Sequence, residues 1–221
     1  MNILLLDHFN RHGGAQEYIL DLANQLQRSG VPCFTPKVTI CTLKKKSDKL
    51  VSIGFPILSF SSRNPLFYIE LIFNIVRLKR FLMGKDIPII HCNSIPVLVI
   101  AKFAKINQKI IFTCHDCSLN NFKLLIISQC CDVIISVSNY VKKFLIKKGI
   151  GKNNYVIYNG FFDISKSYNY YYTPKNHKDR IITFGLIGRV EKWKGGKLFI
   201  RAAKKLLKNI NNVKFLIIGY S

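Results

Sequence analysis

Short apolar runs bounded by turn residues alternate with longer amphipathic segments along most of the chain. Such runs are typical of strands buried on both faces of a parallel sheet, and the segments between them are typical of the helices that cover it. The strands predicted in the first part of the chain span residues 2–6, 37–43, 87–91, 109–114, 133–137 and 155–158. The sequence therefore predicts an α/β fold, a Rossmann-like parallel sheet with helices on both faces.

The segments between these runs predict helices. Residues 17–28 place Tyr18, Leu22 and Leu26 on one face and end before Gly30, a residue suited to the position just past a helix end. Further helices are predicted over 67–82, which is basic, and over 139–148, where Ser138 is a natural N-cap.

A second unit is predicted after residues 161–180, a polar, Tyr-rich segment that we interpret as an interdomain linker. Residues 181–188 and 213–219 are predicted strands. Between them, residues 197–210 predict a basic helix with Leu198, Ala202, Leu206 and Ile210 on one face. A lone βαβ unit leaves a sheet face and both strand edges without partners. The expected organisation is a domain over 1–160, the linker, and an incomplete second domain over 181–221.

The turn after the first predicted strand contains the pair Gly13-Gly14. Two glycines let backbone amides approach a ligand closely, and the helix amino terminus after them favours an anionic group such as a diphosphate. The same pair is also an ordinary turn, and it is not the dinucleotide fingerprint, because no third glycine follows at the required spacing.

Histidines follow two of the predicted strands. His115 lies in Thr113-Cys114-His115-Asp116, directly after a strand, and is expected at the crevice where the carboxyl ends of strands bind ligands. An imidazole there can donate to a hydroxyl or act in proton transfer, although a structural pairing with Asp116 is the alternative. His91, at the end of the preceding strand, is a second candidate.

A basic, glycine-containing loop follows the first strand of the second unit. Arg189 can direct two donors onto a phosphate and Lys194 adds a point charge, while Gly188 and Gly195 leave room for a ligand. A solvated basic loop is the alternative in so Lys-rich a chain.

Read in order, six motifs resemble glycosyltransferase family four over nearly the whole chain. The motifs are Gly13-Gly14-Ala15-Gln16-Glu17, Ile90-His91-Cys92-Asn93-Ser94, Thr113-Cys114-His115-Asp116, Ser136-Val137-Ser138, Val156-Ile157-Tyr158-Asn159-Gly160, and Gly188-Arg189-Val190 with Lys194-Gly195. The resemblance implies the GT-B fold, in which an acceptor-side domain faces a nucleotide-sugar-binding domain, and it implies a retaining transferase that requires no metal or other cofactor.

The resemblance also implies roles for individual residues. His115 matches the family's histidine that contacts the transferred sugar, Gly13 and Gly14 match the loop near the donor diphosphate, and Arg189 and Lys194 match its basic pair. These donors would stabilise the charge that develops on the departing diphosphate, which would then help to deprotonate the acceptor. Further sugar or acceptor contacts are expected from His91, Asp116, Glu17 and Asn159.

The family's two-glutamate motif, which lies further along the donor domain, does not occur in these 221 residues. We therefore expect a fragment of a longer protein, a truncated product that is inactive alone, or a chain completed by a separate polypeptide. The expected partners are a nucleotide-sugar and a glycan or lipid-linked acceptor of surface polysaccharide, lipopolysaccharide or glycolipid synthesis.

The net charge of +23 would attract anionic partners, although the abundant Lys, Asn and Ile also fit the bias of an AT-rich genome. The alternative function is thus a basic module that binds membrane or nucleic acid without catalysis, but no nucleic-acid motif is evident and nucleic acid is not the expected partner. The seven cysteines suggest reduced thiols, the amino terminus lacks a signal-peptide pattern, and no span of about 20 apolar residues occurs. The expected location is the cytoplasm, with peripheral contact to an anionic membrane.

Overall fold

The computed structural model describes residues 2–7, 14–28, 37–42, 67–160, 181–188 and 194–219. The chain divides into two compact units, residues 1–163 and 164–221, and each is treated by itself. Residues 161–180, the predicted linker, lie outside the described residues, so the linker and the domain limits stay predictions.

The first unit contains a six-stranded, wholly parallel sheet in the order β2-β1-β3-β4-β5-β6. Its strands are β1 (Asn2–Asp7), β2 (Lys37–Thr42), β3 (Ile89–Cys92), β4 (Lys109–Cys114), β5 (Val133–Ser136) and β6 (Asn154–Val156). The predicted α/β fold is thus confirmed, and all carboxyl ends of the strands lie at one edge.

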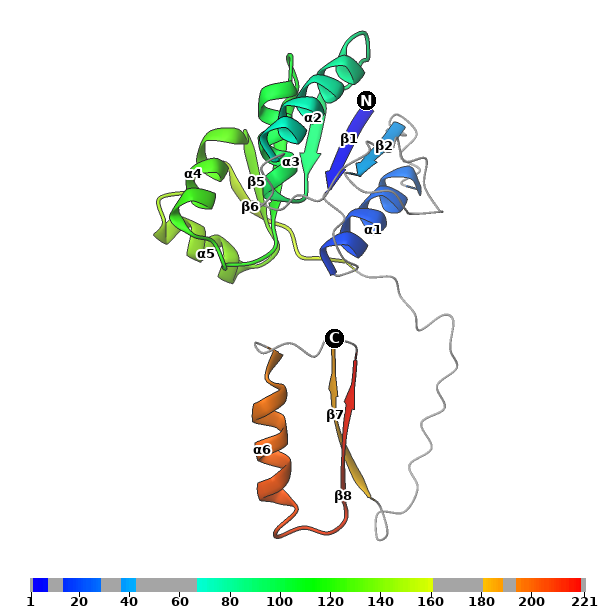
Figure 1. The fold of residues 1–221 in the computed structure, drawn as a ribbon, viewed down its shortest axis with the longest axis vertical. Coiled ribbons are helices and arrows are strands. Elements are labelled where there is room, and N and C mark those ends of the chain that lie inside the picture. Colours follow the sequence, from blue (N-terminus) through cyan, green and yellow to red (C-terminus); the bar gives the residue numbers. More distant parts are fainter. Residues whose placement is uncertain are drawn as a thin grey trace. The chain divides into compact units, whose positions relative to one another are not determined.

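In the described part of the unit five helices accompany this sheet (Figure 1): α1 (Gly14–Arg28), α2 (Phe67–Leu82), α3 (Ile95–Ala104), α4 (Asn121–Cys130) and α5 (Asn139–Lys147). The side chains of α2 to α5 share one core cluster, whereas α1 forms a second cluster with β1. Right-handed crossovers explain this division, because the step from β1 to β2 runs across the sheet in the opposite direction to all the later steps. Helices therefore cover both faces, as predicted.

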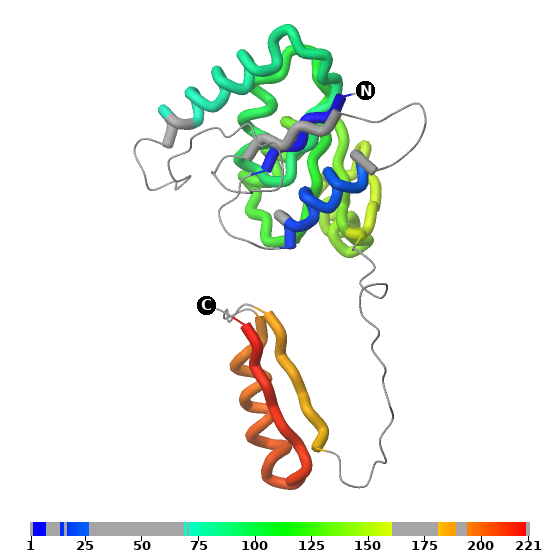
Figure 2. The backbone as a smooth tube through the Cα atoms, turned by 90° about the vertical axis from the view of Figure 1, so that its right-hand side faces the viewer, coloured from blue at the N-terminus to red at the C-terminus, as the bar shows by residue number. Residues whose placement is uncertain are grey.

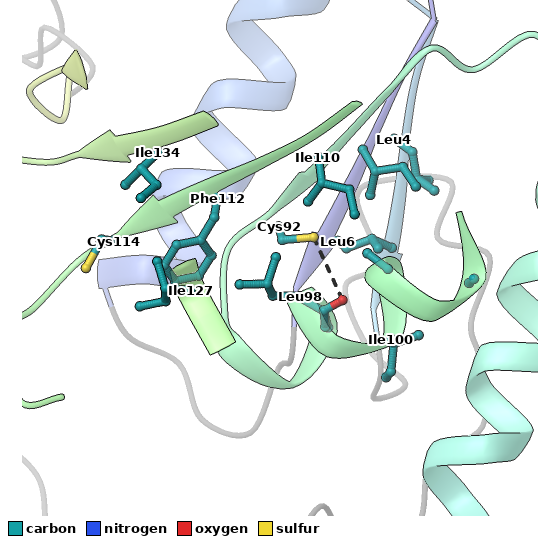
Figure 3. Close-up of a cluster of buried hydrophobic side chains, with 14 of the residues drawn as sticks. Leu4, Leu6, Cys92, Leu98, Ile100, Ile110, Phe112, Cys114, Ile127 and Ile134 are labelled. Atoms are coloured by element: carbon teal, nitrogen blue, oxygen red, sulfur yellow. Dashed lines mark hydrogen bonds between the residues drawn. The ribbon is translucent and has the colours of Figure 1, made fainter. Parts of the chain in front are cut away.

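Alternate strand residues build the larger core (Figure 3). Leu4 and Leu6, Cys92, and Ile110 and Phe112 lie on the face that packs against α3 and α4. Because side chains alternate along a strand, the residues between them, Leu5, His91 and Thr113 among these, belong to the face that carries α1.

Several element limits differ from the predicted ones. β3 begins at Ile89 rather than 87, because the N–H of Ile87 donates to Lys85 O at 3.0 Å and Pro88 has no N–H, so neither residue can donate to the sheet. Helix α1 begins at Gly14, and its most buried residues are Ile19 and Ala23 rather than the predicted row of Tyr18, Leu22 and Leu26.

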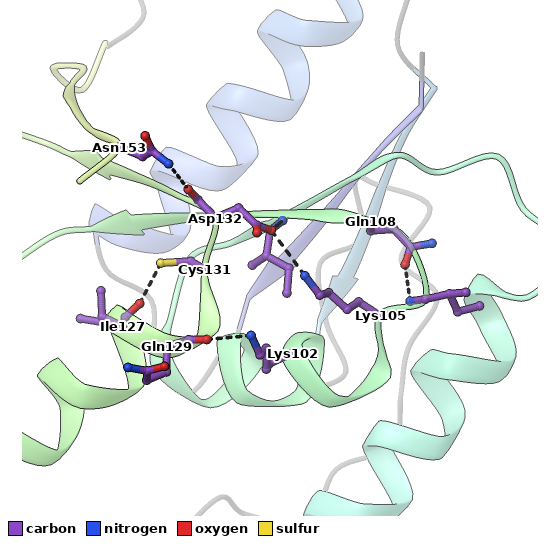
Figure 4. Close-up of polar contacts among 10 residues, drawn as sticks. Lys102, Lys105, Gln108, Ile127, Gln129, Cys131, Asp132 and Asn153 are labelled. Carbon is purple, nitrogen blue, oxygen red and sulfur yellow. Dashed lines mark hydrogen bonds and ion pairs between the residues drawn. The ribbon is translucent and has the colours of Figure 1, made fainter. Parts of the chain in front are cut away.

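The opposite, amino-terminal edge of the sheet is tied together by polar contacts (Figure 4). Asp132 Oδ2 accepts from the N–H of Ile110 at 2.8 Å and lies 3.5 Å from Lys105 Nζ, while Asn153 donates to the carbonyl of Asp132 at 3.1 Å. Desolvation alone would raise the pKa of Asp132, but the Ile110 hydrogen bond and nearby lysines outweigh it, so that pKa is lowered. We therefore assign these polar side chains a structural role, namely to hold the amino-terminal ends of the strands together.

The second unit is the predicted βαβ arrangement, with β7 (Ile182–Ile187) and β8 (Val213–Ile218) parallel and α6 (Gly196–Leu206) between them in sequence (Figure 2). The predicted helix face is only partly right, because Leu206 is half-buried but Leu198 is 71% exposed. Phe199 instead packs edge-on against Phe215, with ring centroids 5.7 Å apart. The aromatic ring buries more area than the leucine would, which sets the rotation of the helix. None of the described residues of this unit is buried.

Candidate functional site

Polar side chains from different elements meet at the carboxyl edge of the first sheet. His115 directly follows β4, Asn93 directly follows β3, and Ala15 lies in the first turn of α1. The N–H of Asn93 donates to Leu6 O at 2.9 Å, which fixes the end of β3 to the end of β1. This edge is where open parallel sheets bind ligands.

Asn93 joins His115 to the amino-terminal turn of α1. Its amide Nδ2 donates to Ala15 O at 2.7 Å, and its Oδ1 lies 2.6 Å from His115 Nε2. A carbonyl can only accept, so the Ala15 contact fixes the orientation of the Asn93 amide and leaves Oδ1 facing the imidazole. His115 Nε2 must then carry the hydrogen, and in the neutral ring Nδ1 keeps its lone pair.

The surroundings of His115 favour this neutral ring. Burial lowers its pKa, and the negative charge of neighbouring Asp116 opposes that effect without reversing it. The ring of Tyr18 from α1 stands edge-on to it, with centroids 5.0 Å apart. An oriented, neutral imidazole beside a helix amino terminus can accept a hydrogen bond from a ligand hydroxyl.

His91 lies deeper and is already engaged. Its Nε2 is 2.7 Å from Thr113 Oγ1, which in turn lies 3.4 Å from the hydroxyl of Tyr18. Burial, with a smaller contribution from the charge of His115, lowers the pKa of His91 to about 4. His91 therefore belongs to a buried polar network beneath His115, and its contact with a ligand stays a prediction.

The other candidates of the first unit are exposed. Asp116 Oδ1 accepts from the N–H of Ser118 at 2.8 Å, so its carboxylate closes the turn after β4. Glu17 lies in the first turn of α1, and Asn159 follows β6. No described hydrogen bond joins these three side chains to His115, although the charge of Asp116 acts on the pKa of its imidazole. Their roles stay predictions.

The predicted donor-binding glycines and cations are only partly described. Gly14 is the first residue of α1, whereas Gly13 and Arg189 lie outside the described residues. Lys194 is exposed and stands immediately before Gly195, the N-cap of α6. Gly195 has φ of 81°, a left-handed conformation that favours glycine, so backbone geometry by itself accounts for this residue.

Five cysteines of the described part are free thiols: Cys92, Cys114, Cys117, Cys130 and Cys131. Burial raises the pKa values of Cys114 and Cys131 to about 12, and that of fully buried Cys92 is also raised. Among the described residues no group of three or more His, Cys, Asp or Glu side chains could hold a metal ion. No described helix is long and apolar enough to cross a membrane.

Sequence reasoning missed Asn93 and Thr113 as parts of the site and named Tyr18 only as a helix-face residue. The strand period could have found the first two, because 91 and 93, like 113 and 115, alternate onto the face that α1 covers. Helices α3 and α4 were also missed as elements. Pro96 in the first turn of α3 and the Asn120 side chain that caps α4 were the available signals.

A Rossmann-like sheet with a histidine at its carboxyl edge, followed by a second βαβ unit, is the arrangement expected of a GT-B-type chain. A family model confirms this and the predicted resemblance: Glycosyltransferase Family 4 matches residues 12–161, more than half of the chain. The chain belongs to this glycosyltransferase family.

Solved structures agree on the fold. Anabaena HepE, crystallised with UDP and glucose, superposes with a TM-score of 0.71 at 19% identity, over 100% of this chain and 61% of its own. The lipopolysaccharide outer core galactosyltransferase WaaB gives 0.70 at 16% identity with the same coverage. A UDP-N-acetylglucosamine 2-epimerase gives 0.60 at 11% identity over 97% of this chain and 62% of its own, so the fold by itself does not define the reaction.

The chain thus spans about three fifths of the length of HepE and of WaaB. A sequence search of curated proteins found no match.

Proposed function

We propose that this chain is the acceptor-side domain and the beginning of the donor domain of a retaining glycosyltransferase, which transfers a sugar from a nucleotide-sugar to a glycan or lipid-linked acceptor. The observation that carries the proposal is the position of His115. In a chain of this family, its imidazole stands at the carboxyl edge of the sheet, held by Asn93 beside the amino terminus of α1.

In this proposal His115 contacts the transferred sugar. Its Nε2 hydrogen is engaged by Asn93, so Nδ1 of the neutral ring accepts a hydrogen bond from a sugar hydroxyl. The edge of the Tyr18 ring limits how the imidazole can turn. A fixed acceptor of this kind orients the donor sugar, and orientation contributes several kcal/mol to a barrier.

In this proposal two kinds of group stabilise the departing diphosphate. The amide of Gly14 belongs to the first turn of α1, and helix amino termini attract anions, while Arg189 and Lys194 supply positive charge. As the glycosidic bond of the donor breaks, its electron pair moves to the diphosphate oxygen, and that oxygen then takes the proton of the attacking acceptor hydroxyl on the same face. Neither step uses a metal or another cofactor.

The acceptor class and location belong to the same proposal. WaaB is named for lipopolysaccharide outer core synthesis, and by analogy we place this chain in surface polysaccharide or glycolipid assembly on the cytoplasmic side of a membrane. Its large positive charge favours peripheral contact with anionic lipid.

The test is hydrolysis of the donor in the absence of an acceptor, measured on the full-length product of the gene. UDP-glucose is tried first because HepE was crystallised with UDP and glucose, followed by other UDP-, GDP- and ADP-sugars. We expect release of nucleoside diphosphate, with the initial sugar product in the anomeric configuration of the donor. His115→Ala should slow it about a hundredfold or more, while Lys123→Ala on the exposed side of α4 should leave it unchanged.

Hydrolysis of none of these donors would contradict the proposal and leave a non-catalytic binding module as the better account. Release of the inverted anomer would contradict retention alone.

A further inference from the structure

Helix α2 has two apolar faces. Its inner face packs into the core through Leu71, Ile75, Leu78 and Leu82. On the opposite side Ile69, Ile72, Phe73 and Val76 are 64%, 62%, 54% and 41% exposed, and Met83 follows just past the helix end at 55%. Positions 69, 72, 73 and 76 have the i, i+3, i+4, i+7 spacing of a single stripe.

This stripe, Ile69 with Ile72, Phe73 and Val76, will be called the outer stripe of α2. A helix that is apolar on both sides is normally covered on both. Among the described elements α3 is the neighbour that packs extensively on α2, and it packs on the inner side (Figures 1 and 2). A contiguous exposed apolar surface of this kind marks an interaction site.

Positive charge accompanies the outer stripe. Lys79 and Arg80 are exposed in the last turn, and the guanidinium of Arg77 lies 5.4 Å from the centre of the Phe73 ring. Exposed Lys85 follows the helix, with its ammonium 4.9 Å from the Phe81 ring. Between residues 67 and 85 the sequence has four basic residues against one acid, Glu70. The occupant of this surface should therefore be both apolar and anionic.

A lipid surface meets both requirements. Apolar side chains along one helix can sink into the boundary between headgroups and acyl chains while lysines and arginines reach the lipid phosphates. A nucleic acid would use the cations but leave Ile72 and Phe73 in water. At 16 residues α2 is about 24 Å long, which allows it to lie along the membrane but is too short to cross it.

We propose that the outer stripe of α2 docks the protein on an anionic bilayer, with the helix parallel to the membrane plane. A short connection, residues 83–88, joins the end of α2 to the start of β3, so α2 returns alongside the sheet in the opposite direction to the strands. The first turns of α2, with Ile69 and Ile72, thus lie toward the edge of the sheet that carries His115. The use of this surface to reach a lipid-linked acceptor rests on the proposed function, but the docking itself does not.

The experiment is co-sedimentation of the full-length protein with vesicles of phosphatidylcholine, with and without phosphatidylglycerol, over a range of salt concentrations. We expect binding to the anionic vesicles only. The double variant Ile72→Ser with Phe73→Ser should bind at least about tenfold more weakly, because two large side chains no longer transfer out of water. The double variant Lys79→Glu with Arg80→Glu should lose most of its low-salt binding.

Matched controls separate this surface from general properties of the chain. Phe122→Ser with Leu125→Ser removes two comparably exposed apolar residues from α4, and Lys147→Glu with Lys148→Glu makes the same charge change at the end of α5. Both controls should bind vesicles like the wild type, apart from a small shared effect of net charge.

Equal binding by the α2 variants and their controls, or no binding by the wild type, would overturn the proposal. A dimer in sedimentation that Ile72→Ser with Phe73→Ser abolishes would assign the stripe to a second copy of the chain instead. Donor hydrolysis without vesicles keeps the two proposals distinguishable, because the α2 variants should hydrolyse donor at the wild-type rate whether or not they bind lipid.

Discussion

Replacement of Asn93 tests the site most sharply, because one side chain holds both the imidazole and the start of α1. Asn93→Ala removes the 2.7 Å bond to Ala15 O and the 2.6 Å bond from His115 Nε2. A net hydrogen bond contributes about 0.5–1.5 kcal/mol, and a partner left unsatisfied in a buried site costs about 1–3 kcal/mol. We therefore expect the free energy of unfolding to fall by about 2–3 kcal/mol.

The effect on activity should exceed what instability explains. A catalytic group misplaced by about 1 Å can cost about a hundredfold in rate, so kcat/KM of Asn93→Ala should fall by about that factor. Asn93→Asp keeps the acceptor for His115 and adds a negative charge, which raises the pKa of the imidazole and should move the acid limb of the pH profile upward by about 1–2 units. Nitrogen chemical shifts of His115 measured by NMR should show hydrogen on Nε2 in the wild type and a mixture of tautomers in Asn93→Ala.

The control is Asn120→Ala, which removes the side-chain cap of α4, where Oδ1 accepts from the N–H of Lys123 at 2.9 Å. It should cost about 1 kcal/mol of stability without moving the pH profile or the His115 resonances. The reasoning is refuted if Asn93→Ala keeps the His115 tautomer and the kcat/KM of the wild type, or if Asn120→Ala shifts the pH profile as Asn93→Asp is expected to.

Three further predictions concern the first unit. Because the folded-state pKa of His91 is lowered to about 4, the unfolded state takes up the proton first, and stability is lost as the pH falls from about 6.5 toward 4. In urea unfolding the wild type should therefore lose about 2 kcal/mol more than His91→Gln between pH 7 and pH 5. Ser138→Ala removes the cap that accepts from the N–H of Val141 at 3.2 Å and should cost about 1 kcal/mol by the same method. Leu98→Ala opens a cavity in the core and should cost about 2–5 kcal/mol in thermal or urea unfolding, whereas exposed Phe103→Ala should stay within about 0.5 kcal/mol.

The sequence predicts the sheet well because its strands are short apolar runs between turn residues. The segment that becomes α3 shows the limit of that signal. Ile95–Ala104 is apolar on nearly all sides, as a helix in contact with α2, α4 and the sheet can be, so it lacks an amphipathic period. In α6 the period is clear but the buried face is only partly the predicted one, because Phe199 makes a ring contact with Phe215, which lies further along the chain.

The position of His115 follows from its place after a strand, and this part of the site was predicted. Its chemical state was not predictable, because the tautomer depends on Asn93 and Ala15, which are 22 and 100 positions away in the chain. Burial around His91 likewise follows only from the packing of α1 over the sheet. Strand patterns thus locate such a site, and long-range contacts decide which of its groups are available to a ligand.

The central claim is that the imidazole of His115 meets the sugar of a nucleotide-sugar. The most direct measurement is the nitrogen chemical shift of His115 Nδ1 in the full-length protein, recorded with the nucleotide-sugar that it hydrolyses and with the matching nucleoside diphosphate alone. The account predicts that the nucleotide-sugar shifts Nδ1 as it accepts a hydroxyl hydrogen, and that the diphosphate leaves it nearly unchanged. An unchanged Nδ1 with bound nucleotide-sugar, or the same shift with both ligands, would contradict it.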